Sequence, residues 1–241
     1  DENIMQPKFD DQKVIYDSLL MDLERANTLY TKTSTIDAKR DLLYNGDVTK
    51  WRKFTNSLYL RLLMRVSNRR DMNSAERIKT VFENPSQYPI FESNDDNATF
   101  YYDEVNPFVN YFGNILESAF TTTGRRPAEQ IIGMMDAPGD PRISIWFKQA
   151  SGYDGWKGAE SGKEAQESDN SGVSLLNKAN LGDYASPYSH MKYDEVLFIF
   201  AEAIKRGWID GGDALAEQYY NDAVRASIRF WSDVNKTGNP V

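Results

Sequence analysis

Apolar residues near the C-terminal end of the chain recur at three- and four-residue steps, which is the spacing of one helical face. A first helix is predicted to end just before Gly207, which suits a left-handed C-terminal cap. A second helix follows Gly211-Gly212, with Asp213 as its candidate N-cap. The apolar positions are Val196, Leu197, Phe200, Ala201 and Ile204 in the first helix, and Leu215, Tyr219, Ala223, Ala226 and Phe230 in the second. Tyr193–Trp231 is therefore predicted to be a tetratricopeptide-like helical hairpin, a unit that usually builds binding scaffolds rather than catalytic clefts.

Two longer helices are predicted in the N-terminal part of the chain. Asp10 is the candidate cap of a helix over residues 10–30, with one apolar face made of Val14, Ile15, Leu19, Leu23, Ala26, Leu29 and Tyr30. Asp47 is the candidate cap of a helix from Val48 to about Ser67, which has apolar residues on two sides. Because a helix of that kind is normally buried between neighbours, Trp51 is expected in the core and not in a ligand site.

Shorter elements are predicted in the middle of the chain. Asn73 and Glu76 have the spacing of a capping box for a helix ending near Phe82. Residues 99–102 are predicted to be extended, and Asn106-Pro107 is predicted to start a helix that runs through Phe108, Phe112, Leu116 and Phe120. Another short helix is expected from Pro127 to about Met135, and residues 143–147 alternate in the manner of an extended segment. The fold class predicted from these elements is all-α, with helical hairpins and long irregular loops.

Residues 148–190 form a predicted irregular excursion with little helical periodicity and six glycines between Ser151 and Ser189. Irregular segments of this length within a compact domain are commonly functional or disordered. Five aromatic residues flank or interrupt the excursion, namely Trp146, Tyr153, Trp156, Tyr184 and Tyr188. We expect a ligand site among them.

Charge and composition limit the classes of partner. The chain has 36 acidic and 28 basic residues, a net charge of -8, and 13% aromatic residues. A net acidic chain argues against a nucleic-acid or anionic-membrane partner, because both require a clustered basic face. There is no cysteine, which excludes disulfides, thiolate zinc sites and a cysteine nucleophile. No apolar run approaches the ~18 residues of a membrane-spanning helix.

Catalytic and cofactor motifs are not found. The chain has a single histidine, His190, which excludes multi-histidine zinc sites and lies in no nucleophile-elbow pattern. Phosphate-binding glycine loops and calcium loops are absent as well. Paired carboxylates could in principle hydrolyse glycosides, but sequence cannot place two of them at the needed separation. The predicted protein is therefore not an enzyme and requires no metal or cofactor.

Four segments, in this order along the chain, together resemble the SusD/RagB family of outer-membrane nutrient-binding lipoproteins, specifically its SusD-like branch. They are YNGDVTKWRKFTNSLYLRLLMRVSNR (Tyr44–Arg69), PIFESNDDNATFYY (Pro89–Tyr102), DPRISIWF (Asp140–Phe147) and the Tyr193–Trp231 hairpin. The resemblance implies one SusD-like helical domain over residues 1–241. It also implies that the chain is partial, since members are longer and carry a lipidated cysteine in their export signal.

The resemblance further implies a function. Members are lipid-anchored at the surface of Bacteroidetes-type bacteria, where they cap a SusC-type TonB-dependent transporter and capture oligosaccharides or, in some branches, peptides. The expected localisation is thus the outer membrane at the cell surface, with membrane attachment only through a lipid anchor. Ligand contacts of the family follow no motif, so no binding residue is transferred.

Sugar capture has a physical requirement that the excursion could meet. Pyranose rings stack on Trp and Tyr, and their hydroxyls need polar partners. Trp156, between glycines in GYDGWKG, is interpreted as a ligand platform, with a tertiary anchor or simple exposure as alternatives. Tyr153, Tyr184, Tyr188 and Trp146 are further candidates, although packing explains Trp146 as well. The candidate hydroxyl partners are Asp154 and, less directly, Asn177 and Asp183.

Two other functions remain open from the sequence. A peptide- or protein-binding helical-repeat module would have a concave groove lined by polar and charged residues, with the loop aromatics buried. A carboxylate-based hydrolase would need two acids facing each other across a cleft, one with a raised pKa.

Overall fold

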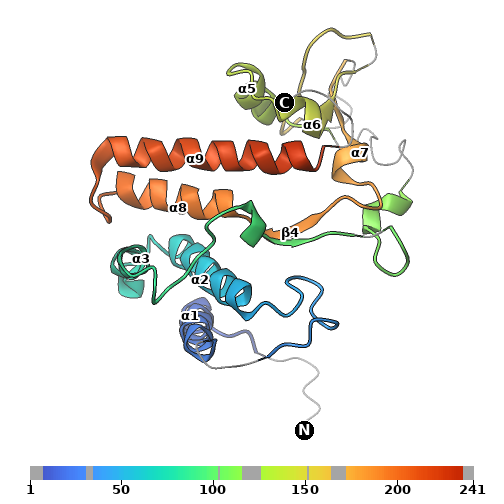
Figure 1. The fold of residues 1–241 in the computed structure, drawn as a ribbon. Coiled ribbons are helices and arrows are strands. Elements are labelled where there is room, and N and C mark those ends of the chain that lie inside the picture. The colour runs from blue at the N-terminus through green and yellow to red at the C-terminus, as the bar shows by residue number, and fades with distance from the viewer. Residues whose placement is uncertain are drawn as a thin grey trace. The chain divides into compact units, whose positions relative to one another are not determined.

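The computed structural model describes residues 8–30, 35–102, 104–115, 126–150, 152–163 and 172–235. Its described part is mostly helical with a few short strands, which confirms the predicted all-α, tetratricopeptide-like class (Figure 1). The chain divides into two compact units. Unit 1 comprises residues 1–98 and 190–224, and unit 2 comprises residues 99–189 and 225–241.

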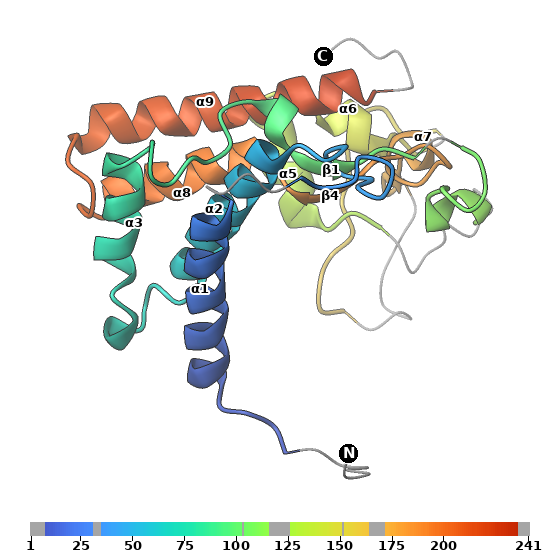
Figure 2. The same cartoon turned by 60° about the horizontal axis from the view of Figure 1, so that its bottom comes forward.

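Unit 1 is built from helices that pack around one apolar core. They are α1 (Gln12–Leu29), α2 (Val48–Arg65), α3 (Ser74–Glu83), α8 (Tyr193–Lys205) and the first part of α9 (Gly212–Asp233), with 3-10 turns η1 (Arg70–Met72) and η2 (Asn94–Asp96). Helix α2 lies between α1 and α8, and α1 lies alongside it (Figures 1 and 2). Leu60 and Leu63 of α2 are fully buried, as are Ile78 of α3 and Val196 of α8. The two-sided apolar pattern of α2 thus correctly predicts a helix enclosed by neighbours.

The start of α2 is organised by two aspartates. Asp47 caps the helix as predicted, because its side chain accepts hydrogen bonds from the backbone N–H groups of Thr49 and Lys50. Trp51 packs against the core cluster of unit 1, and its ring meets that of Tyr44 edge-on at 5.4 Å. This confirms the core role expected for Trp51. The buried carboxylate of Asp41 accepts the indole N–H of Trp51 at 2.8 Å.

Helix α1 forms as predicted, but it packs through a different face. The side chain of Asp11, and not Asp10, accepts the capping hydrogen bond. The residues that pack are Tyr16, Leu20, Leu23 and Asn27, whereas Val14, Ile15, Leu19 and Leu29 of the predicted face are exposed. A polar network selects this face. The side-chain oxygen of Asn27 accepts hydrogen bonds from Asn56 at 3.1 Å and from Arg52 at 2.8 Å. Asn56 also donates to the carbonyl of Pro89 at 2.8 Å, so buried amides fix the contact between α1 and α2.

The predicted hairpin is present as α8 and α9, which lie side by side and antiparallel within unit 1 (Figure 1). Gly207 has a φ of +73° and directly follows Arg206, the C-cap residue of α8. It is the left-handed C-terminal glycine that the sequence predicts. The prediction that Asp213 is the N-cap of the second helix is wrong, because α9 begins at Gly212. Asp213 lies in the first turn of α9 instead, where its carboxylate pairs with Lys205 at 2.7 Å.

Unit 2 has short elements around a second, smaller core. They are η3 (Tyr111–Asn114), α5 (Glu129–Asp136), α6 (Ile143–Trp146), α7 (Lys178–Leu181) and the strands β2 (Phe147–Lys148) and β3 (Leu175–Leu176). Strands β2 and β3 are antiparallel, with Phe147 opposite Leu176. A second two-stranded sheet pairs β1 (Ala98–Phe100) with β4 (Tyr188–Met191). The second core consists of Ile132, Met135, Ile143 and Phe147.

Three local predictions in the middle of the chain are corrected. Asn73 precedes α3 but is in the left-handed region, with φ +49°, and its side chain makes no cap bond. Residues 143–146 form a one-turn helix, and only residues 147–148 are extended. No helix starts at Asn106-Pro107: a bridge pairs Val105 with Phe108 and the 3-10 turn η3 follows. Leu116 and Phe120, at the end of that predicted helix, lie outside the described residues.

Candidate functional site

Exposed aromatic rings gather around Gly113 in unit 2. Asn110 caps the 3-10 turn η3 with its side chain, which accepts a hydrogen bond from the backbone N–H of Phe112 at 2.9 Å. The rings of Tyr111 and Phe112 follow and meet edge-on at 5.5 Å. Tyr111 is 78% exposed, so its ring stands in solvent instead of packing in a core.

Tyr184 comes to the same place from a distant part of the chain. Its carbonyl accepts the backbone N–H of Asn110 at 2.8 Å, and the Asn110 side chain donates to the carbonyl of Ser186 at 2.8 Å. Its ring lies so close to Gly113 that a β-carbon there would be 2.7 Å from Cδ1 of Tyr184. Tyr184 is still 40% exposed. We call the set Tyr111, Phe112 and Tyr184 the aromatic ledge.

The aromatic ledge has a polar edge. The hydroxyl of Tyr184 donates to the side-chain oxygen of Asn114 at 3.1 Å, and Asn114 is itself exposed. The ammonium of Lys178 lies 3.4 Å from the carbonyl of Gly113. An apolar ring face next to hydrogen-bonding groups is an arrangement that suits a sugar ring.

Two further aromatic candidates of the sequence are exposed in unit 2. Tyr188 projects from β4, and the hydroxyl of the next residue, Ser189, is 2.8 Å from that of Thr99 on β1. Tyr153 lies against Gly172, where an added β-carbon would be 3.1 Å from the tyrosine ring. Asp154 beside it is exposed. The contacts above join Tyr184 to η3 and place Tyr153 beside Gly172.

The two tryptophan candidates lie elsewhere, against the second core. Trp156 and Trp146 are both partly buried and pack on the cluster that contains Ile132 and Phe147. Trp146 also meets Trp231 edge-on at 5.4 Å, and the guanidinium of Arg142 is 5.3 Å from its ring centre. These contacts correspond to the anchor interpretation of Trp156 and the packing interpretation of Trp146. Their predicted ligand contacts remain predictions.

The polar candidates differ in how far their side chains are exposed to solvent. Asn177 is 1% exposed, so its amide faces the interior of unit 2 and not a surface ligand. Asp183 is partly buried, and its backbone N–H donates to the hydroxyl of Ser186 at 2.8 Å, which shapes the turn that carries Tyr184. Asp183 therefore contributes to the ledge by helping to fix the position of Tyr184.

Unit 2 also holds a partly buried carboxylate whose pKa is shifted, Asp140. The side chain of Arg142 forms a fork with the carboxylate of Asp140, and these hydrogen bonds outweigh the effect of burial and lower the pKa of Asp140. A general acid needs the opposite shift. Among the residues that the structure describes, no group of three His, Asp or Glu side chains is placed to hold a metal ion. None of the described helices is both long and apolar enough to cross a membrane.

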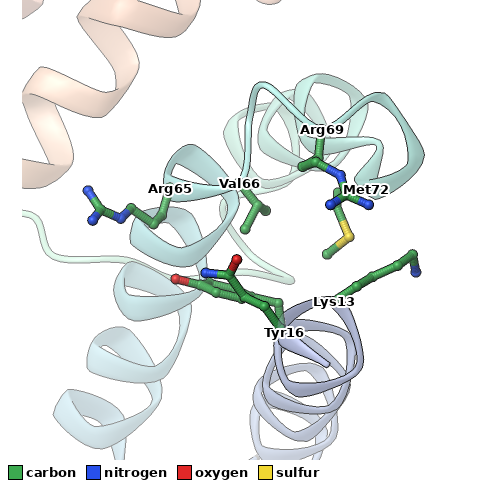
Figure 3. A pocket seen from close by; sticks show the side chains of 7 residues that line it. Lys13, Tyr16, Arg65, Val66, Arg69 and Met72 are labelled. Atoms are coloured by element: carbon green, nitrogen blue, oxygen red, sulfur yellow. The ribbon is translucent and has the colours of Figure 1, made fainter. Parts of the chain in front are cut away.

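A small pocket of about 140 Å³ lies between α1, the end of α2 and η1 in unit 1 (Figure 3). Its rim carries the cations Lys13, Arg65 and Arg69, which would suit an anion. Two of these charges are already matched, because Lys13 pairs with Asp17 at 2.5 Å and Arg69 pairs with Asp71 at 3.0 Å. Figure 3 shows the Arg65 guanidinium turned away from the pocket. We therefore do not regard this pocket as a ligand site.

The sequence does not predict the most exposed members of the ledge, Tyr111 and Phe112, as ligand contacts. The spacing from Phe108 to Phe120 predicts a helix with Phe112 on an apolar face. Asn110, with a side chain that favours turns, is the one local signal that argues against that helix. The approach of Tyr184 is a tertiary contact that no local pattern reports.

A comparison with family models matches residues 1–239 to the SusD-like family described as starch-binding and associating with the outer membrane. The chain belongs to the SusD-like family. This membership confirms the resemblance of the four sequence segments. A comparison with curated proteins finds no match.

Solved structures show the same fold. A chitin-binding protein is 28% identical, with a TM-score of 0.76 over 100% of this chain and 52% of its own. A SusD homologue from Bacteroides fragilis is 26% identical, with a TM-score of 0.78 over 98% of this chain and 55% of its own. A second one from that species is 27% identical, with a TM-score of 0.79 over 97% of this chain and 52% of its own. The SusD-like chain thus spans about half the length of these relatives.

Proposed function

We propose that this SusD-like chain is part of a non-catalytic cell-surface protein that captures oligosaccharides. The observation that carries the proposal is the aromatic ledge, where exposed rings are held by backbone hydrogen bonds beside polar groups. A pre-positioned ring costs little entropy when a sugar stacks on it. Each stack contributes about 0.5–1.5 kcal/mol beyond its buried area, so affinity for a short oligosaccharide is modest.

The family and one relative support a glycan as the ligand. The family description includes starch binding, and one related structure is that of a chitin-binding protein. Starch is uncharged, and chitin is uncharged apart from the amino groups of any deacetylated units. A net charge of -8 disfavours an anionic polysaccharide. We infer that the ligand is a neutral glycan.

The proposed setting is the outer membrane. The family description includes association with this membrane. We propose that the full-length protein is lipid-anchored at the cell surface and delivers its ligand to a SusC-type TonB-dependent transporter. In this proposal the lipid anchor attaches the protein to the membrane. No nucleic acid, metal or cofactor enters the proposal.

The alternative is a module that binds peptides or proteins. It predicts that the loop aromatics are buried, whereas Tyr153, Tyr184 and Tyr188 are all exposed. One observation does favour a protein partner, namely a groove between α8 and α9 in unit 1. That groove and the aromatic ledge lie in different units, so the two functions can be tested separately.

The test is affinity gel electrophoresis against neutral polysaccharides, with calorimetric titration of soluble oligosaccharides from any polysaccharide that retards the protein. We expect Tyr111→Ala and Tyr184→Ala each to weaken binding by about three- to tenfold. Tyr220→Ala, which removes an exposed tyrosine of α9, is the matched control and should bind like the wild type. Loss of binding in Trp156→Ala alone, with the ledge variants unaffected, would move the site from the ledge to Trp156. Absence of retardation by every glycan would overturn the proposal for this chain.

A further inference from the structure

The sequence contains one Asn-Gly pair, Asn45-Gly46, in the turn just before α2. Both residues lie in the left-handed region of backbone space, with φ +51° at Asn45 and φ +83° at Gly46. Asparagine and glycine adopt this conformation at the lowest cost. Gly46 has a second constraint, because a β-carbon there would be 2.6 Å from the carbonyl oxygen of Ile36. The backbone of this turn therefore selects the pair.

An Asn-Gly pair is also the pair most prone to deamidation, because glycine has no side chain to shield its backbone nitrogen. In the first step the nitrogen of Gly46 bonds to Cγ of Asn45 and the Cγ–Nδ2 bond breaks. Ammonia leaves with the proton that the Gly46 nitrogen loses. Water then opens the resulting succinimide ring at one of its two carbonyls, which gives aspartate or isoaspartate. The turn thus combines a backbone that requires this pair with a chemistry that threatens it.

The fold holds the attacking nitrogen in another bond. The backbone N–H of Gly46 donates to Oδ2 of Asp41 at 2.8 Å. Asp41 is 6% exposed, and the same oxygen accepts the indole N–H of Trp51 at 2.8 Å. The other oxygen, Oδ1, accepts the backbone N–H groups of Leu43 at 3.1 Å and Tyr44 at 3.2 Å. Because donors hold both of its oxygens, the carboxylate cannot follow the Gly46 nitrogen when that nitrogen moves.

We propose that Asn45 is a latent deamidation site that Asp41 keeps inactive. Ring closure requires the Gly46 nitrogen to lose its hydrogen and to approach Asn45, so the bond to Asp41 must break first. The negative charge of Asp41 also opposes the loss of that proton, because an amide anion would form beside a carboxylate. Deamidation therefore proceeds only from a locally opened turn.

The reaction would change the start of α2. Isoaspartate adds one carbon to the backbone between residues 45 and 46, two positions before the helix cap Asp47. The hydrogen bond from the N–H of Asp47 to the carbonyl of Tyr44, at 3.0 Å, spans this lengthened link. The bond from Gly46 to Asp41 spans it as well, so we expect the product to have a looser entry to α2.

The proposal does not depend on glycan capture or on what covers the surface of unit 1, because the reaction is intramolecular and needs only water. The experiment compares the deamidation rate of the protein with that of a synthetic peptide of residues 41–50 at the same temperature and pH. Tryptic digestion yields this same segment, DLLYNGDVTK, from the wild type, and chromatography with mass spectrometry separates its asparagine, aspartate and isoaspartate forms.

Two variants are measured in the same way. Asp41→Ala removes the acceptor of the Gly46 N–H. Ile78→Val is the control, because Ile78 is fully buried in α3 and its truncation destabilises unit 1 without touching the bond between Asp41 and Gly46. Circular dichroism checks that both variants keep their helices.

We expect the folded wild type to deamidate at Asn45 about 10- to 100-fold more slowly than the peptide, which is the range that a hydrogen bond to a charged acceptor supplies. Asp41→Ala should recover most of the peptide rate, and Ile78→Val should stay close to the wild type. Equal rates in wild type and peptide would overturn the proposal, as would equal rates in wild type and Asp41→Ala. A rate for Ile78→Val as high as that of Asp41→Ala would assign the reaction to global unfolding and overturn it too.

Hydrogen exchange of the Gly46 amide tests the same bond in the wild type without a substitution. Opening of the bond to Asp41 limits both exchange and ring closure, so the two reactions should be slowed by similar factors relative to the peptide. A Gly46 amide that exchanges as fast as in the peptide would overturn the proposal even if Asp41→Ala does not fold.

Discussion

The ring of Tyr184 lies against the backbone of Gly113, so closely that a β-carbon on Gly113 would be 2.7 Å from Cδ1 and 2.9 Å from Cα of Tyr184. Since the second distance is to backbone, rotation of the ring cannot relieve the overlap. We therefore predict that Gly113→Ala displaces the Tyr184 loop and weakens oligosaccharide binding by about three- to tenfold. Calorimetric titration measures the affinity, and circular dichroism checks that the helices are retained.

Gly133 provides the control for this prediction. It lies inside α5, and a β-carbon added there has no atom within 4 Å. Gly133→Ala should bind the same oligosaccharide as the wild type does, and it should raise the free energy of unfolding by about 0.5–1 kcal/mol because alanine is the better helix residue. Unchanged affinity in Gly113→Ala would show that the close approach of Tyr184 does not position a binding ring.

The long helices could be predicted from the sequence because their signals are local. Asp47 precedes a helix with apolar residues on two sides, and Gly207 follows one with a single strong stripe. Periodicity does not say which face will be covered, however. In α1 the exposed stripe with Ile15 and Leu19 is as apolar as the packed one, and the buried amides of Asn27 and Asn56 decide between them.

The ledge could be predicted only in part. Tyr184 is a candidate from the sequence because it stands in an irregular, aromatic segment, whereas the pattern around Tyr111 and Phe112 predicts a helix. Their exposure depends on the hydrogen bonds between Asn110 and the Tyr184–Ser186 turn, which are 74 and 76 residues away in sequence. Likewise, Trp156 between glycines looked free of regular structure, yet it packs on the second core through long-range contacts.

Asp41 is predicted to be a strong determinant of the stability of unit 1. Its carboxylate accepts the backbone N–H groups of Leu43, Tyr44 and Gly46 as well as the indole N–H of Trp51, at 2.8–3.2 Å. Asp41→Ala leaves these donors without their acceptor, and we expect the free energy of unfolding to fall by about 1–3 kcal/mol. Urea titration followed by circular dichroism measures the change. Asp37→Ala, which removes an exposed carboxylate, should cost much less.

The contribution of Asp41 should depend on pH in a defined direction. Burial opposes ionisation, but the hydrogen bonds from Trp51 and from the backbone outweigh it and lower the pKa of Asp41. A group with a lowered folded-state pKa stabilises the fold above its unfolded pKa of about 3.9, and the contribution is lost as pH falls through the folded value. The difference between wild type and Asp41→Ala should therefore be constant from pH 7 to about 5 and shrink below about pH 4. A difference that grows on acidification would contradict this assignment.

Trp156 is predicted to contribute more to the stability of unit 2 than to ligand binding. Its partly buried ring packs on the second core, so Trp156→Ala should destabilise unit 2 by about 2–3 kcal/mol, somewhat less than for a fully buried tryptophan. Limited proteolysis, with fragments assigned by mass spectrometry, measures the opening of unit 2. Trp156→Phe should recover most of the resistance, and Met134→Ala, at an exposed position of α5, should leave it unchanged. Full resistance in Trp156→Ala together with lost glycan binding would instead identify Trp156 as a ligand platform.

Arg61 of α2 and Glu195 of α8 form a two-pronged ion pair, with Nε and one terminal nitrogen each 2.5 Å from a carboxylate oxygen. The same terminal nitrogen donates to the carbonyl of His190 at 2.9 Å, which ties α2 to the segment that leads into α8. Both side chains are about one-third exposed, so solvent screens the pair and we expect a coupling energy of about 0.5–1.5 kcal/mol. A double-mutant cycle of Arg61→Ala and Glu195→Ala in urea titrations measures this energy, which should decrease as salt is raised.

Replacing Arg61 with lysine separates the effect of the positive charge from that of the guanidinium shape. Arg61→Lys keeps the charge but cannot reproduce the two-pronged contact, so it should lose most of the coupling. The Lys205–Asp213 pair is the matched control, because its side chains are 66% and 83% exposed and its coupling should be close to zero. A coupling as small for Arg61–Glu195 as for this control would show that apolar packing alone joins α2 to α8. Retention of the coupling in Arg61→Lys would show that charge, and not the shape of the guanidinium, is what the contact requires.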